Sequence, residues 1–173
     1  LLTRKTVVNQ PDQDPILIGI SSDISQQKQT EKQLLDAKHK FQGIFNNTFQ
    51  FMTLLDPSGR IIESNQPALD FYAHQLDLIQ GQYLWEQQGL SEASQANLHE
   101  KIAQAQAGQF IRYELHSQGA QGQLMVSDFS LKPVYNQAHE VEWLLAEGRD
   151  ISEKKQLESE LENTLNLQQA ILE

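Results

Sequence analysis

The 173-residue sequence contains no cysteine. Disulfides, thiolate zinc sites, iron–sulfur sites, cysteine nucleophiles and any cofactor joined through a thiol are therefore excluded. Basic residues are also few, because 13 lysines and arginines stand against 23 aspartates and glutamates, for a formal net charge of −10. Since phosphate neutralisation needs a local basic excess, this balance argues against a nucleic-acid partner.

Long apolar runs are missing as well. No window approaches the roughly 18 apolar residues of a transmembrane helix, and residues 1–20 lack the basic start and apolar run of a signal peptide. A cysteine-free acidic chain without these segments is compatible with the cytoplasm, which is the expected localisation. The chain starts on Leu1 and stops inside a predicted helix, so we expect it to be a piece of a longer protein.

An internal repeat is the most informative pattern that is present. Residues 1–37 align without a gap onto residues 128–164, at an offset of 127 and with 12 identities. The identities cluster where Asp23-Ile24-Ser25 recurs as Asp150-Ile151-Ser152. A fixed offset across two types of element indicates tandem units. We therefore expect the end of one unit, a complete second unit and the opening of a third.

Residue patterns within the unit predict an α+β fold. Alternation, β-branched runs and turn residues predict strands at 1–8, 15–22, 51–55, 60–63, 110–116, 123–134 and 141–148. Helical spacing predicts a short helix at 65–73 and a longer one at 91–107. Two strands, helices and then three strands fit an antiparallel sheet with its helices on one side.

Each Asp-Ile-Ser triplet opens a predicted amphipathic helix. A capping box, an acidic N-cap with Gln or Glu three residues on, begins at Asp23 and again at Asp150. The stretch after Asp150 carries a loose stripe of leucines. The stretch after Asp23 has the spacing of a coiled-coil seam, which favours pairing in a parallel homodimer, the alternative being a helix packed on its own domain. Its seam residues are Thr30, Leu34, Ala37, Phe41 and Ile44.

Taken in order, four motifs resemble a PAS domain with C-terminal PAC strands. They are an acidic hairpin turn with glycine, an asparagine that opens a short helix, a glycine before an aromatic-rich segment, and the terminal triplet. In this sequence they are residues 55–62, 65–68, 79–81 and 150–152. The resemblance covers residues 41–152. It implies a PAS fold: a five-stranded antiparallel sheet with short helices on one side, flanked by amphipathic linker helices.

The resemblance also implies a domain organisation. We expect residues 1–22 to be the C-terminal strands of a preceding PAS unit and residues 23–46 to be a linker or signalling helix. Residues 47–150 would form the PAS domain, and residues 151–173 an exit helix that leads to a further unit.

The implied function is that of a non-catalytic sensory or relay module in a multidomain signalling protein, with a sensor histidine kinase as the preferred parent. The alternatives are a PAS dimerisation scaffold without ligand and a PAS module of a diguanylate cyclase or phosphodiesterase. Expected partners are a second copy of the chain, neighbouring PAS and kinase or cyclase domains, and a small-molecule ligand. No pair of nucleophile and base emerges, so no catalytic residue is predicted.

The missing cysteine limits the choice of cofactor. Light-sensing flavin PAS domains need a reactive cysteine, so a thiol-linked flavin or chromophore is excluded. The heme-binding subgroup places its iron-ligating histidine on the long helix, at the position that Leu98 occupies here. His99 is one residue off, and one residue turns a side chain by about 100° around a helix. We therefore expect His99 to face solvent, and we assign no cofactor.

Aromatic and apolar residues provide candidates for a pocket between the sheet and the helices. Small-ligand sites combine such side chains with a few polar groups, although the same residues often only fill the core. The candidates are Tyr83, Trp85, Leu98, Ile102, Tyr113, Phe129 and Trp143. The other histidines share no metal-ligand spacing, so no metal site is predicted and they are expected on the surface or in loops. They are His39, His74, His116 and His139.

Signal coupling is expected where the last strand meets the exit helix. Asp150 ends that strand and begins the helix, Ser152 follows it in the repeated triplet, and Asp23 is the counterpart of Asp150 in the first repeat. A salt bridge from Asp150 to a basic residue of the sheet, such as Arg112, would couple the sheet to the helix. The alternative is simple N-capping, which contributes about 1 kcal/mol.

Overall fold

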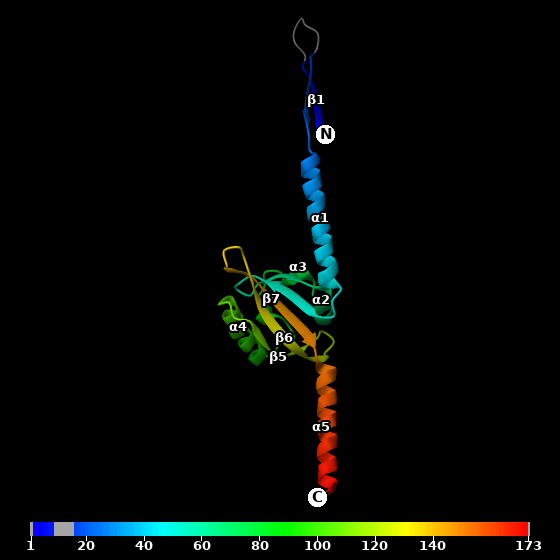
Figure 1. Ribbon diagram of the computed structural model, residues 1–173, viewed down its shortest axis with the longest axis vertical. Helices are drawn as coiled ribbons and strands as arrows, with labels where there is room; N and C mark the ends of the chain where they lie inside the picture. The colour runs from blue at the N-terminus through cyan, green and yellow to red at the C-terminus, as the bar shows by residue number, and fades with distance from the viewer. Residues whose placement is uncertain (1, 9–15, 173) are drawn as a thin grey trace. The chain divides into compact units, whose positions relative to one another are not determined.

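The computed structural model describes residues 2–8 and 16–172 (Figure 1). Leu1 and Pro15, the first residues of the strands predicted at 1–8 and 15–22, lie outside the described residues. The chain divides into two compact units, Leu1–Ile44 and Phe45–Glu173.

The first unit consists of a hairpin and a helix. Strands β1 (Leu2–Val8) and β2 (Ile16–Ser22) pair antiparallel, and helix α1 (Ser25–Asn46) follows and continues into the second unit. Asp23 caps the helix, because its Oδ1 accepts a hydrogen bond from the Ser25 backbone N–H at 2.9 Å. That hydrogen bond holds the pKa of Asp23 below its usual value.

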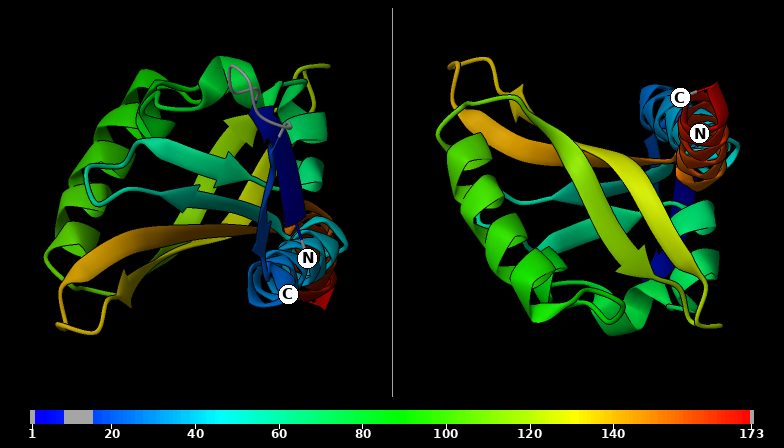
Figure 2. Two further views of the ribbon diagram at one scale, coloured as in Figure 1. Left: turned by 90° about the horizontal axis from the view of Figure 1, so that it is seen from above. Right: turned by 90° about the horizontal axis from the view of Figure 1, so that it is seen from below.

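The second unit contains a five-stranded antiparallel sheet with the order β4-β3-β7-β6-β5, which confirms the predicted fold class. The helices that accompany the sheet lie between β4 and β5 in the chain, and Figure 2 shows α4 beside the five strands. Helix α5 follows β7. The bounds are β3 Phe51–Leu55, β4 Ile61–Ser64, α2 Gln66–Tyr72, α3 Leu76–Ile79, the 3-10 helix η1 Leu84–Glu86, α4 Glu92–Gln106, β5 Ile111–Gln118, β6 Leu124–Tyr135, β7 Val141–Asp150 and α5 Ser152–Leu172.

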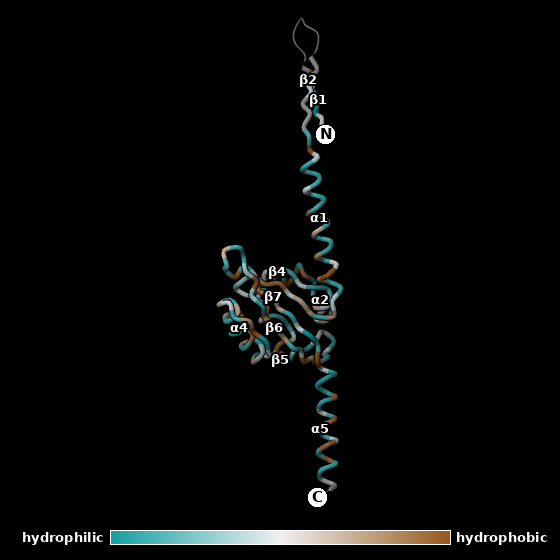
Figure 3. Tube along the Cα trace, in the orientation of Figure 1, coloured by the Kyte–Doolittle hydropathy of each residue, from teal (hydrophilic) through white to brown (hydrophobic). Residues whose placement is uncertain are grey.

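The core lies between the inner face of this sheet and its helices. Side chains alternate along β5, where Leu115 and Ser117 are buried while Arg112 and Glu114 are exposed. Helix α4 contributes Leu98, Ile102 and Ala105 to the core cluster, opposite apolar side chains of β6 and β7. Figure 3 shows that hydrophobic residues gather in this sheet and that α1 and α5 are mainly hydrophilic.

The turn between β3 and β4 explains the acidic turn motif without any catalytic role. The Asp56 carboxylate accepts hydrogen bonds from the Arg60 backbone N–H at 2.9 Å and from the Ser58 hydroxyl at 2.7 Å. Gly59 has φ +90°, and a Cβ there would lie 2.6 Å from the Trp85 ring. Only glycine therefore fits both the backbone conformation and the space.

Candidate ligand pocket and helix junctions

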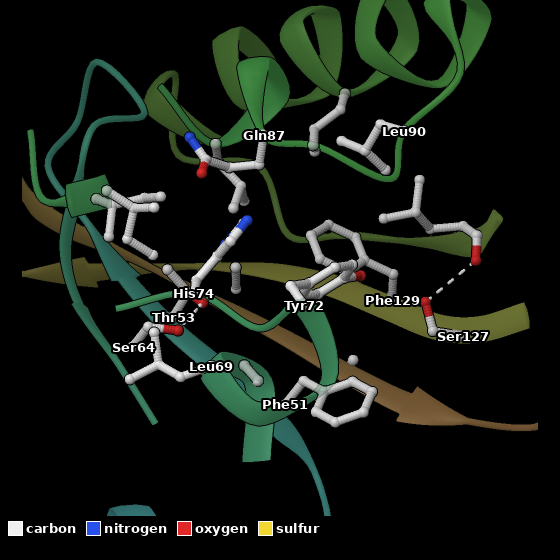
Figure 4. Close-up of a pocket in the computed structure, with 18 of the residues that line it drawn as sticks. Phe51, Thr53, Ser64, Leu69, Tyr72, His74, Gln87, Leu90, Ser127 and Phe129 are labelled. Atoms are coloured by element: carbon white, nitrogen blue, oxygen red, sulfur yellow. Dashed lines mark hydrogen bonds between the residues drawn. The ribbon is translucent and has the colours of Figure 1, made fainter. Parts of the chain in front are cut away.

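A cavity of ≈ 80 Å³ lies between the inner face of the sheet and the helices (Figure 4). All five strands contribute to its wall, together with α2, α3, α4 and the segment around η1. The lining residues are Phe51, Thr53, Ile61, Ser64, Ala68, Leu69, Tyr72, His74, Ile79, Leu84, Gln87, Gln88, Leu90, Leu98, Leu115, Met125, Ser127, Phe129, Ala146 and Gly148. The wall is therefore mostly apolar, with a few polar groups.

Most of the polar groups in the wall are hydroxyls that bond to the protein itself. The Thr53 and Ser64 hydroxyls lie 3.0 Å apart across β3 and β4. The Ser127 hydroxyl donates to the Leu115 carbonyl at 3.2 Å, and the Tyr72 hydroxyl donates to the Ser117 hydroxyl at 3.0 Å. Burial raises the pKa of Tyr72, so its phenol remains neutral at physiological pH.

His74, Gln87 and Gln88 complete the polar part of the wall. Ala73 ends α2 in the left-handed conformation, with φ 49°, and His74 follows it with its ring stacked on that of Tyr72 at 5.8 Å. Burial lowers the pKa of His74, which favours the neutral imidazole. The Gln87 side-chain amide donates to the Gln82 side chain at 3.2 Å and to the Tyr83 carbonyl at 3.0 Å.

The structure brings only part of the predicted pocket set together. Leu98 and Phe129 line the cavity, whereas the other five candidates are not among its lining residues. Ile102 is buried in the core, and Tyr113 packs against that core with its ring 5.6 Å from Phe129. Burial raises the pKa of Tyr113 to about 12. Trp143 is 39% exposed.

Tyr83 and Trp85 form an aromatic stack outside the cavity. Their ring centroids lie 4.3 Å apart, and the Arg60 guanidinium lies over the Tyr83 ring at 3.9 Å. The His99 ring lies 4.5 Å from Trp85 on the other side of this group. The side chains therefore pack on one another, and the sequence positions alone do not distinguish that arrangement from a pocket wall.

The residues present do not fit a heme. Leu98, at the helix position that the heme-binding subgroup gives to histidine, is only 1% exposed and lines the cavity. The His99 side chain is exposed and contacts Trp85. A cavity of ≈ 80 Å³ is also far too small for a porphyrin. Among the described residues, no group of three or more His, Asp or Glu side chains is arranged to hold a metal ion.

The structure adds polar wall residues that the sequence did not single out. Thr53 and Ser127 alternate with other inward residues of β3 and β6, so strand alternation could have indicated them. Ser64 lies three residues after Ile61, which also lines the cavity, so alternation along β4 could not have indicated it. Tyr72 and His74 flank the left-handed end of α2, and no short motif marks that geometry. His74 had been expected on the surface or in a loop. It does lie between α2 and α3, but its ring lines the cavity.

At the exit junction, hydrogen bonds join α5 to the sheet. Asp150 Oδ1 accepts from the Ser152 backbone N–H at 2.8 Å, which is the predicted N-cap. The Ser152 hydroxyl accepts from the Val126 backbone N–H at 2.9 Å, and the Ile151 backbone N–H donates to the Val126 carbonyl at 2.9 Å. The neighbours of Val126 in β6, Met125 and Ser127, both line the cavity.

Ion pairs on the outer face of the sheet correct one predicted contact. Arg112 pairs with Asp128, at 2.8 Å from Nε and 2.5 Å from Nη2, and not with Asp150. Arg112 opposes Ser130 in β6, so Asp128 is its diagonal neighbour on the same face. The hydrogen bond from Arg112 lowers the pKa of Asp128.

A different basic residue connects α5 to the sheet. Lys155, in the first turn of α5, pairs with Glu114 of β5 at 2.5 Å. The hydrogen bond that Lys155 donates to the Glu114 carboxylate raises the pKa of Lys155. An exposed pair of this kind contributes little to stability, but it places a side-chain contact between α5 and a second strand.

At the input junction, one buried asparagine connects the end of α1 with β3 and α2. Asn65 is 0% exposed, and its Oδ1 accepts from Met52 N at 3.0 Å and from Ala68 N at 3.2 Å. Its Nδ2 donates to the carbonyls of Phe45 at 3.0 Å and Gln50 at 2.8 Å. The predicted N-cap of the short helix is therefore confirmed, and the same side chain also holds the last turn of α1.

A sheet with a cavity beneath its helices and a helix hydrogen-bonded to that sheet defines the class of small α+β sensory modules. A family model described as the PAS fold matches residues 45–156. The chain therefore belongs to the PAS family.

Known relatives point to signal transduction. The sensor histidine kinase TmoS of Ectopseudomonas mendocina is 34% identical over 122 residues, which are 68% of this chain and 12% of that protein. Hybrid signal transduction histidine kinase D of Dictyostelium discoideum is 35% identical over 127 residues, which are 71% of this chain and 8% of that protein. The chain thus matches a small part of each relative, and it is a non-catalytic sensory PAS module of a signalling protein.

A solved structure supports the same fold. The PAS domain of an HTR-like protein from Haloarcula marismortui superposes with a TM-score of 0.59 at 20% identity, covering 72% of this chain and 99% of that one.

Among the described residues, no helix is long and apolar enough to cross a membrane.

Proposed function

We propose that this chain is a sensory and relay module of a cytoplasmic sensor histidine kinase with several PAS units. In this proposal, a small molecule in the cavity, or a change in the dimer, alters the sheet and so repositions α5. The two histidine kinase relatives support this parent.

The observation that carries the proposal is the bonding of Val126. Its backbone N–H and C=O both bond to the start of α5, at Ser152 and Ile151, while its neighbours Met125 and Ser127 line the cavity. A shift of this part of β6 is therefore transmitted directly to the first turn of α5. Asp150 positions that turn as its N-cap, and Lys155 adds a contact to β5.

Exposed apolar side chains on both linker helices support a homodimer. Leu34 and Ile44 of α1 are 71% and 78% exposed, and Leu157 and Leu161 of α5 are 58% and 61% exposed. Leu157 and Leu161 are the repeat counterparts of Thr30 and Leu34, so the two stripes begin at the same distance from Asp23 and Asp150. We propose that both helices pair in parallel across the dimer.

The proposed domain organisation follows the repeat. Residues 1–22 would complete a preceding PAS unit, 23–46 would link it to the PAS domain of 47–150, and 151–173 would lead to a further unit. The N-cap of α1 supports this assignment, since Asp23 accepts from Ser25 as Asp150 accepts from Ser152.

Deleting residues from α1 in the full-length kinase tests the relay. Removing four residues within 28–40 rotates the seam by about 40° and breaks its heptad register, whereas removing seven residues preserves that register. We expect the four-residue deletion to abolish or invert the signal response of autophosphorylation and the seven-residue deletion to retain it. An unchanged response after the four-residue deletion would contradict the relay through these helices.

Two alternative functions remain as proposals. One is a PAS dimerisation scaffold without ligand, which the exposed seams also suit. The other is a PAS module of a diguanylate cyclase or phosphodiesterase. Native mass spectrometry of the purified chain separates the scaffold from the sensor, because a retained small molecule supports sensing. A dimer that carries no small molecule from any expression medium favours the scaffold.

A further inference from the structure

The chemistry of the cavity wall restricts the ligand, provided that the proposed ligand pocket is correct. None of the lining residues, all of which belong to the described part of the chain, is an Asp, Glu, Lys or Arg. Such residues make up 21% of the chain as a whole. The one titratable base in the wall, His74, has its pKa lowered by burial, and the Tyr72 phenol has its pKa raised.

A wall of this kind disfavours ionised ligands. A carboxylate, phosphate or ammonium group that enters the cavity loses its hydration and finds no opposite charge among the lining side chains. The charged groups of the sheet lie elsewhere, because Arg112, Asp128 and Lys132 surround a separate depression on the other face of the strands.

One pair of hydroxyls is arranged to hold a polar group of a ligand. Thr53 and Ser64 are nearly buried and bond to each other, which uses one of their two protons. The remaining proton is available to an acceptor in the cavity. Figure 4 shows these two residues and His74 on one side of the view, with Phe129 and Ser127 on the other. The Thr53–Ser64 hydroxyl pair and the Phe129 ring therefore lie on different sides of the cavity.

Size sets a further limit. A single water needs about 10–15 Å³, and an apolar cavity of about 150 Å³ admits benzene. At ≈ 80 Å³, about half of that volume, this cavity has room for a molecule of about three heavy atoms. We propose that the cavity selects a compact, uncharged organic molecule whose single hydroxyl or carbonyl group bonds to the Thr53–Ser64 pair, and that it rejects carboxylates, phosphates and ammonium ions.

Three small molecules of similar size test this selectivity. Ethanol, acetate and ethylammonium are titrated into the purified 173-residue chain, and amide chemical shifts of cavity residues are followed by NMR. We expect ethanol to shift the amides of Ser127 and Gly148 in a saturable manner, and both ions to bind at least about tenfold more weakly.

The outcomes separate the two levels of the proposal. If either ion binds as tightly as ethanol, the neutral-ligand inference is wrong while the ligand pocket stands. If none of the three causes saturable shifts at cavity residues, the ligand pocket itself is wrong and the inference falls with it.

A matched pair of variants tests the hydroxyl contact. Thr53→Val is nearly isosteric and removes the Thr53 hydroxyl, so ethanol affinity should fall by roughly threefold to tenfold. Ser130→Ala removes a nearly buried hydroxyl on the outer face of β6 and should leave affinity unchanged. Equal affinity in Thr53→Val and wild type would overturn the proposal that the polar group of the ligand bonds to the Thr53–Ser64 pair. Ser64→Ala serves the same purpose if Thr53→Val does not fold.

Discussion

The hairpins β1–β2 and β6–β7 occupy equivalent positions of the repeat, yet their strands pair differently. Lys5 opposes Gly19 in the first hairpin, whereas Lys132, the counterpart of Lys5, opposes Leu145, which is the counterpart of Ile18. The two registers therefore differ by one residue as far as Val134 and by two at Tyr135, because the β6–β7 register shifts between these residues. In the second unit β6 and β7 have β5 and β3 as further neighbours, while β1 and β2 form a two-stranded sheet.

This difference separates the features of the repeat that depend only on residues close in the sequence, called local here, from those that depend on the rest of the sheet. The N-cap is local, because Asp23 and Asp150 accept the same hydrogen bond at 2.9 and 2.8 Å. Strand register is not local, because it is set by neighbouring strands and by the face that must be buried. The bond from Val126 to Ser152 likewise needs the full sheet.

The largest expected effect is in the core of the second unit. Leu144 of β7 is 0% exposed, so Leu144→Ala should lower the free energy of unfolding by about 2–5 kcal/mol. Val7 of β1 is 58% exposed, and Val7→Ala should change it by less than about 0.5 kcal/mol. Urea denaturation followed through backbone amide NMR signals of each unit measures both, because the two tryptophans, Trp85 and Trp143, lie only in the second unit. Equal losses in the two variants would show that the hairpin is packed as tightly as the sheet.

An intermediate effect is expected at the first residues of α5 and α1. Ser152→Ala leaves the Val126 N–H without its acceptor and should lower the free energy of unfolding by about 1–2 kcal/mol. Ser25, its repeat counterpart, is exposed, and Ser25→Ala should cost less than about 0.5 kcal/mol. Ser152→Thr keeps the hydroxyl and serves as the control. A loss in Ser25→Ala as large as that in Ser152→Ala would remove the distinction between the starts of the two helices.

The smallest effect concerns the outer face of the sheet. Because the pKa of Asp128 is lowered in the folded state, its contribution to stability is present above its unfolded value of 3.8 and is lost as pH falls through the folded pKa. The carboxyl carbon resonance of Asp128 should therefore titrate below pH 3.8 in wild type and closer to 3.8 in Arg112→Gln. Identical midpoints in the two proteins would contradict the Arg112–Asp128 pair as the cause.

Sequence patterns predicted the sheet and the two capped helices because they have long periodic signals. Helices α3 and η1 were missed, since four- and three-residue helices contain too few residues to show a period. Among the cavity residues, Leu98 and Phe129 could be chosen as inward apolar residues. Tyr72 and His74 could not, because the left-handed turn at Ala73 decides where their side chains point.

The partners of charged side chains on different strands also could not be predicted from the sequence. The prediction that Arg112 pairs with Asp150 was wrong because the register of β5 on β6 places Asp128 nearer to Arg112. The contact from α5 to β5 is made instead by Lys155 and Glu114. Side-chain type could be read from the sequence, but the choice of partner depends on strand order and register.

Amide hydrogen exchange at Val126 tests the central claim, that the cavity wall and the exit helix are joined at this residue. In wild type the Val126 N–H should be protected, because it donates to the Ser152 hydroxyl at 2.9 Å. In Ser152→Ala its exchange should be at least about tenfold faster, while the Met125 and Ser127 amides change little. An exchange rate at Val126 that is the same in both proteins would contradict the account.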